Sequence, residues 1–266
     1  MQRIKIKIKL GPFLKKRGLE IAPLCAAVIV WQIIADFAVK NPFILPSFYS
    51  VVLSLFKLWR IIPLDIFMSL LHFGIGLALA ICVAVPIGAC MGWFRRVDRA
   101  VDPIIEVIRP IPPIAWIPFA IIWCHLTHQA AGFVVFIGAV FPILINTYAG
   151  FRGVEKILVE AAQVLGCSKN RDLIKSVAFP SSLPSIATGI RIGMGVGWMC
   201  VVAAEMFGVS RYGLGFRLFQ RFYFLHQTDN LLLYMIILGL IALILDRAFR
   251  YFVEERLFRW RAGIVV

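Results

Sequence analysis

Residues 159–166 read VEAAQVLG, and they begin the longest well-charged segment between two apolar runs of the chain. Glu160 to Leu165 are good helix formers, and Gly166 tolerates the left-handed backbone of a helix C-terminal cap. A second helical run, about residues 169–178, is expected to end at Pro180, because proline lacks the N–H that a helix interior needs. The sequence therefore predicts two short helices joined at a glycine.

The predicted first helix carries a small apolar face beside charges. Ala161 and Ala162 would let another protein approach closely, while Glu160 and the basic residues that follow would orient it. Composition alone leaves a second interpretation open, in which the segment is an ordinary connector between membrane helices.

These residues also resemble a known motif. Glu160-Ala161-Ala162, followed by Gly166 and by Phe179-Pro180, is similar to the EAA loop of ABC-importer permeases. The spacing from Gly166 to Pro180 is one residue longer than the usual pattern, and Phe179 stands where leucine is usual. The resemblance implies that Glu160, Ala161, Ala162, Gly166 and Pro180 dock the loop into a groove of a cytoplasmic ATPase.

Composition places the chain in a membrane. Of its 266 residues 61% are hydrophobic, and the mean hydropathy is +0.88, so a soluble core could not hide this apolar surface. The net charge of +14 could suggest a nucleic-acid-binding protein. However, the basic residues cluster at the ends of apolar runs, and no basic-aromatic binding motif is present. The six cysteines show no metal or redox spacing, so we interpret them as packing residues.

We predict an all-α, polytopic membrane protein with six spans. A basic cytoplasmic tail covers residues 1–20, a single transmembrane domain covers 21–253 with a cytoplasmic coupling loop at 150–184, and a second cytoplasmic tail covers 254–266. An outer interfacial helix is expected near residues 50–59. The six expected spans cover residues 21–39, 65–93, 103–124, 130–149, 185–207 and 231–252.

The third span is unusual because four prolines, at positions 110, 112, 113 and 118, fall within it. Each removes a backbone donor and leaves a carbonyl that lipid cannot satisfy. We therefore expect this helix to face protein or a solute pathway.

The basic residues also predict the orientation. About 20 of the 28 Lys and Arg residues lie beside the proposed inner ends, and about 6 lie outside. Both termini and the Glu160 loop are thus expected in the cytoplasm.

The sequence contains no enzyme signature. It has no phosphate-binding loop ending in Lys-Ser/Thr, no nucleophile elbow and no His-Glu-x-x-His metal pair, so we predict no catalytic residue, no metal site and no bound cofactor. Any energy source must then be a separate protein.

Charged residues inside apolar spans are the better candidates, because each costs about 2.5–3.5 kcal/mol at mid-bilayer. Arg109, Arg191 and Glu205 are such residues, and Glu106 lies one turn from Arg109, where the two could pair. The candidates for a pathway or gate are Arg109, Pro110, Pro112, Pro113, Arg191 and Glu205. Snorkelling or a structural ion pair is the alternative for each.

Three glycines, Gly189, Gly193 and Gly197, recur every four residues on the fifth span. This spacing clears one helix face for close packing. The face fits either a seam between two permease subunits or packing within one subunit.

Three further stretches narrow the resemblance to the nitrate/sulfonate/taurine/bicarbonate branch of ABC-importer permeases. They are RPIPPIAWIP at 109–118, FPILINTYAG at 141–150, and residues 187–205. The resemblance covers about residues 21–260, and the proline-rich run is its most specific part.

This resemblance implies a type I importer permease in a bacterial plasma (inner) membrane, moving a small solute by alternating access. Its implied partners are cytoplasmic ATPase subunits that hold ATP and Mg²⁺, a periplasmic or extracellular solute-binding protein, a second permease subunit, as in a homodimer, and membrane lipid. Anions such as sulfonates, taurine, nitrate or bicarbonate are favoured, although the branch also includes importers of cyclic and vitamin-like solutes.

Two other functions remain open from the residues. An ion-gradient-driven secondary transporter or channel would need membrane-buried coupling carboxylates, of which the sequence offers few, and often an inverted repeat. A membrane scaffold for an enzyme would not require the proline cluster.

Overall fold

The computed structural model describes residue 23 and residues 25–253, and this part of the chain is helical without a strand. The tails predicted at 1–20 and 254–266 lie outside the described residues. An apolar helix at Cys25–Val39, whose last part is the π-helical η1 (Ile34–Val39), comes first. The further elements in chain order are α2 (Phe48–Leu58), α3 (Ile62–Trp93), α4 (Arg95–Ile108), η2 (Pro113–Trp116), α5 (Ile117–Cys124), α6 (His128–Arg152), α7 (Lys156–Val164), α8 (Asn170–Leu173), η3 (Ile174–Ala178), α9 (Phe179–Met206), α10 (Leu214–Phe216), η4 (Arg217–Tyr223) and α11 (Thr228–Arg250).

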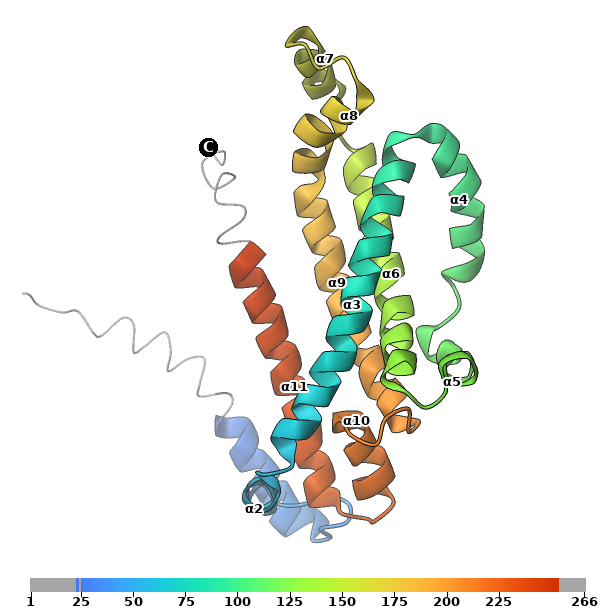
Figure 1. Cartoon of the computed structure of the whole chain (residues 1–266). Coiled ribbons are helices and arrows are strands. Elements are labelled where there is room, and N and C mark those ends of the chain that lie inside the picture. The colour runs from blue at the N-terminus through green and yellow to red at the C-terminus, as the bar shows by residue number, and fades with distance from the viewer. Residues whose placement is uncertain (1–22, 24, 254–266) are drawn as a thin grey trace, which may run out of the picture.

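Three long helices form the centre of the bundle. Helix α6 packs along both α3 and α9. Helix α11 lies beside α9 at the edge of the bundle (Figure 1). In its most apolar stretch 61% of the α6 residues are buried, against 17% for α11, so α6 is the central span and α11 faces mostly outward. The exposed aliphatic side chains of α3 and α11 suit a lipid environment.

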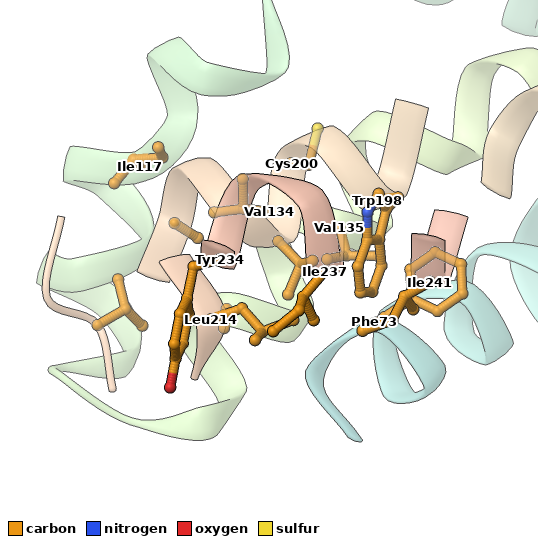
Figure 2. Close-up of a cluster of buried hydrophobic side chains, with 14 of the residues drawn as sticks. Phe73, Ile117, Val134, Val135, Trp198, Cys200, Leu214, Tyr234, Ile237 and Ile241 are labelled. Carbon is orange, nitrogen blue, oxygen red and sulfur yellow. The ribbon is translucent and has the colours of Figure 1, made fainter. Parts of the chain in front are cut away.

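The largest core lies where α3, α6, α9 and α11 meet (Figure 2). Phe73 of α3 packs edge to face against Trp198 of α9, with ring centroids 5.6 Å apart. The Trp198 indole N–H donates to the Leu238 carbonyl at 3.3 Å, which also ties α9 to α11. Aromatic pairs of this kind add about 0.5–1.5 kcal/mol beyond area burial.

The expected number of six spans is not confirmed. Four described helices are long and apolar enough to cross a membrane, and a fifth span results only if the bent pair formed by α4 and the helix at Pro113–Cys124 is counted as one. The first helix is described as the 15-residue segment Cys25–Val39, which is short for a span at 1.5 Å per residue.

The third span differs from the continuous helix expected at 103–124. Helix α4 runs back along the bundle, and the chain then turns by 86° into η2 and α5 (Figure 1). Pro110, Pro112 and Pro113 lie in or beside the break, where the missing N–H groups prevent a helical ladder. The prolines therefore break the span instead of bending it gently.

Candidate functional site

The polar segment that precedes α9 projects beyond the end of the bundle (Figure 1). Helix α7 contains Glu160, Ala161 and Ala162; the first two are exposed and Ala162 is half-buried. Val164 and Leu165 at its end are 89% and 85% exposed. A large apolar surface held away from the bundle, beside an exposed carboxylate, is suited to binding another protein.

Gly166 ends α7 with φ +100°, a left-handed conformation that favours glycine. The amides of Gly166 and Cys167 donate to the carbonyls of Gln163 and Ala162, each at 3.0 Å. These bonds satisfy carbonyls at the helix end, as the sequence predicts for a glycine cap.

Pro180 does not end the second helix. Helix α8, η3 and α9 run on as one helical segment from Asn170 to Met206, with Pro180 in the first turn of α9. The wider π-helical turn at Ile174–Ala178 ends two residues before the proline, which has no N–H to donate to the preceding turn. The part of the predicted coupling loop from Asn170 onward is therefore continuous with the fifth span, so a force on this part would act on α9 directly.

Arg109 is positioned by the break after α4. Its side chain is exposed, and it forms no hydrogen bond or ion pair with the described part of the chain. The pairing with Glu106 that the sequence suggests is therefore not formed. Pro110, Pro112 and Pro113 follow it on the exposed side of the same turn, with Pro113 half-buried.

Arg191 has a partner on another span. Its guanidinium meets the carboxylate of Asp246 on α11, with Nε–Oδ1 at 2.6 Å and Nη2–Oδ2 at 3.0 Å. The pair lies at a cavity of about 180 Å³ between α9 and α11, lined mainly by apolar side chains. This bidentate geometry joins the two helices, which is the structural alternative considered for Arg191.

Glu205 is fully buried near the end of α9 opposite α7 (Figure 1). Its Oε2 accepts from Ser69 Oγ at 2.8 Å and from the Gly215 amide at 2.9 Å, and its Oε1 lies 2.9 Å from His72 Nδ1. His72 Nε2 in turn lies 2.7 Å from His128 Nδ1.

A second buried carboxylate, Asp65, lies beside this cluster. It accepts from Tyr234 Oη at 2.9 Å, from Arg217 Nε at 3.0 Å and from the Gly213 amide at 3.3 Å. Glu205 and Asp65 thus hold the segment Gly213–Tyr223 against the ends of α3, α9 and α11 that lie opposite α7 (Figure 1).

Asp65, Ser69 and His72 are not among the site residues predicted from the sequence. They are polar residues at positions i, i+4 and i+7 of the second span, a spacing that places them on one face of a helix. Polar residues at this spacing in an apolar span could have indicated a buried network.

The three spaced glycines of α9 face α6 of the same chain. An added methyl group would lie 2.7 Å from Asn146 Cβ at Gly189, 3.0 Å from Ile143 Cγ1 at Gly193 and 3.2 Å from Val135 Cγ1 at Gly197. The structure therefore uses this face for packing within one subunit.

The comparisons with known proteins agree with this architecture. The sequence matches the family described as "Binding-protein-dependent transport system inner membrane component" over residues 76–257. The chain belongs to this family. It is accordingly a membrane subunit of an ABC importer and not an enzyme: ATP is hydrolysed by a separate partner, and a binding protein brings the solute.

Individual relatives cover nearly the whole chain. A protein of Methanocaldococcus jannaschii named as an ABC transporter permease is 43% identical over 93% of each chain. The taurine transport system permease protein TauC of Escherichia coli is 31% identical over 95% of this chain and 93% of its own. The nitrate import permease protein NrtB of Synechocystis is 33% identical over 84% of this chain and 83% of its own.

A solved structure shows the same fold. A chain of the MetNI methionine ABC transporter, in inward-facing conformations, superposes with a TM-score of 0.61 at 19% identity, over 79% of this chain and 97% of that chain. The predicted ABC-importer permease fold and the resemblance to the taurine and nitrate branch are confirmed.

Proposed function

We propose that the chain forms, as a homodimer in the plasma membrane, the pathway through which an ABC importer takes up a small anion of the sulfonate, taurine, nitrate or bicarbonate type. The similarity to permeases named for taurine and for nitrate, over most of the chain, carries this proposal. Nitrate is an anion, and taurine carries a sulfonate group that is ionised at neutral pH. The chain itself binds no cofactor, and ATP and Mg²⁺ are held by the ATPase.

Coupling runs through the α7 segment. The ATPase docks on Glu160, Ala161 and the exposed end of α7, and Gly166 sets the angle between this helix and the continuous segment that begins at Asn170. ATP-driven closure of the ATPase pair then moves α9 as a lever, which opens one side of the pathway at a time.

Of the six pathway candidates, Arg109 and the three prolines beside it keep this role. Arg109 is exposed and carries no counter-ion among the described residues. Arg191 and Glu205 hold neighbouring helices through the contacts given above, and we assign them to positioning the pathway walls.

Reconstitution tests this proposal. The chain is purified with its ATPase and binding protein in proteoliposomes, and ATP hydrolysis is measured with taurine, alkanesulfonates, nitrate, bicarbonate and heterocyclic vitamin precursors. We expect one of the anions to stimulate hydrolysis and to accumulate inside. Stimulation by the vitamin precursors alone would contradict the anion assignment.

Glu160→Lys tests the docking surface. We expect it to reduce ATPase co-purification and uptake by about tenfold or more, because it reverses the charge at the docking helix while leaving the membrane core intact. Glu155→Lys makes the same charge change at the start of the same helix, where the Glu155 side chain forms no capping bond, and should keep most of the activity. Equal behaviour of the two variants would argue against docking at Glu160.

A further inference from the structure

A cavity of about 350 Å³ lies where the broken third span meets α6 and α9. Its wall includes Arg109, Ile111 and Pro113 from the break, Phe141 and Asn146 from α6, and Ile192 from α9. The α6 residues that line it, 137–146, are at the middle of the 25-residue span His128–Arg152. The cavity is therefore at mid-depth in the membrane.

Arg109 is the charged residue of this wall. The other lining residues are apolar or, in Asn146, a neutral amide. No described carboxylate pairs with the guanidinium, whereas Arg191 and Arg217 are each bonded to an aspartate. An uncompensated charge at mid-bilayer is costly, so its persistence there indicates that something else supplies the negative charge.

The backbone at the break supports the same conclusion. Irregular backbone at membrane depth is tolerated where it is buried in protein or lines a cavity, and discontinuous helices commonly form solute sites near the midplane. Here the irregular residues 109–112, between α4 and η2, include two of the cavity-lining residues.

Asn146 has capacity left for a ligand. One amide N–H donates to the Pro142 carbonyl at 2.8 Å, which fixes the side chain, and the carbonyl oxygen and second N–H remain. A fixed amide in the same cavity wall as a guanidinium can recognise a polar group at a second point of a bound solute.

We propose that this cavity binds the transported solute during its passage, with Arg109 holding an oxyanion that carries a single negative charge. The guanidinium fork matches the planar or tetrahedral oxygens of a nitrate, bicarbonate or sulfonate, and the apolar wall accommodates a short carbon chain. A dianion such as sulfate would keep one uncompensated charge in a low-dielectric site, so it is excluded. This inference rests on the proposed function, since it locates the anion within that pathway.

The first experiment measures binding and does not require transport. The complex of the permease with its ATPase, in lipid nanodiscs, is unfolded by heat with methanesulfonate, nitrate, sulfate or gluconate as sodium salts. Each salt is compared between the wild-type chain and Arg109→Gln, because the general effects of each salt on stability then cancel. We expect methanesulfonate or nitrate to raise the Tm of the wild type more than that of Arg109→Gln, and sulfate to act on both alike.

The second experiment measures uptake in proteoliposomes with the binding protein, using methanesulfonate and nitrate. Arg109→Gln should lower the uptake rate at subsaturating solute by about tenfold or more, and Arg109→Lys, which keeps the charge without the fork, should lower it less. Arg99→Gln, an exposed arginine on α4 outside the cavity, should behave like wild type. ATPase co-purification with each variant checks that it folds.

Each outcome decides one proposition. Equal Tm shifts in wild type and Arg109→Gln, or wild-type uptake by Arg109→Gln, would overturn the Arg109 site while leaving anion import standing. Failure of every anion to stimulate the wild-type importer would overturn the proposed function. A sulfate shift that depends on Arg109 would overturn the selectivity for a single charge.

Discussion

Glu205 and Asp65 are fully buried carboxylates, so each needs hydrogen-bond donors around its oxygens. Backbone amides supply part of this: Gly213 donates to Asp65, and Gly215 donates to Glu205. Gly213 has φ +136°, and an added methyl group there would lie 2.5 Å from the Glu205 carboxyl carbon. The turn can approach the carboxylates this closely only because glycine stands at this position.

Removing the Glu205 carboxylate should loosen the segment Gly213–Tyr223. In Glu205→Ala, Ser69, the Gly215 amide and His72 lose their common partner inside the protein, at a cost of about 3 kcal/mol in the free energy of unfolding. Hydrogen exchange should show faster exchange in peptides covering residues 213–223. Asp102→Ala, which removes an exposed carboxylate from α4, should change stability by less than about 0.5 kcal/mol. Undiminished protection of residues 213–223 in Glu205→Ala would show that Glu205 does not hold this segment.

Part of this network of buried polar residues could have been predicted from the sequence. Asp65, Ser69 and His72 show a helical spacing that can be recognised, and Glu205 was selected because an apolar span contained it. Their meeting was not predictable, because the partners come from positions more than 130 residues apart and from backbone amides that carry no sequence signal.

At the scale of elements, the contact between α6 and α9 shows how far a sequence pattern can predict helix packing. The four-residue repeat of Gly189, Gly193 and Gly197 predicts a close helix contact, but the same repeat fits a contact with a second subunit equally well. Only the location of Asn146, Ile143 and Val135 opposite the glycines identifies α6 of the same chain as the partner. Likewise, the prolines predict a third span that faces protein or a pathway but not its break by 86°, since that angle depends on how α5 packs against α6.

The glycine face makes a prediction with an internal control. Gly189→Ala should lower the free energy of unfolding by about 1–3 kcal/mol, because the new methyl group would overlap Asn146 Cβ at 2.7 Å. Gly195→Ala lies on the same helix with no neighbour within 4 Å, so it should be neutral or stabilising by up to about 1 kcal/mol through its better helix propensity. Thermal unfolding of both variants in the same detergent measures the difference. A Gly189→Ala protein as stable as Gly195→Ala would mean that α6 and α9 separate easily at this contact.

At the scale of the whole molecule, the two ends of the helix bundle carry different kinds of residues. One end has α7, with its exposed apolar residues; the other has the turn between η4 and α11, next to the buried carboxylates (Figure 1). The continuous helical segment from Asn170 to Met206 joins these two ends. A movement of α7 that is passed on at the Gly166 turn can therefore reach Glu205, and the segment that Glu205 holds, through one continuous helical segment, as alternating access driven from one side requires.

This arrangement requires that α7 face the cytoplasm, as the distribution of Lys and Arg predicts. Cysteine labelling tests it. In a chain with Cys167 as its single cysteine, a membrane-impermeant maleimide should label inverted vesicles but not intact cells, because Cys167 lies just after α7 and is partly exposed. In a chain without native cysteines, Leu225→Cys, which is exposed in the turn between η4 and α11, should show the opposite pattern. Labelling of Cys167 from outside intact cells would place the docking helix where no ATPase can reach it, and the coupling proposal would then fail together with the predicted orientation.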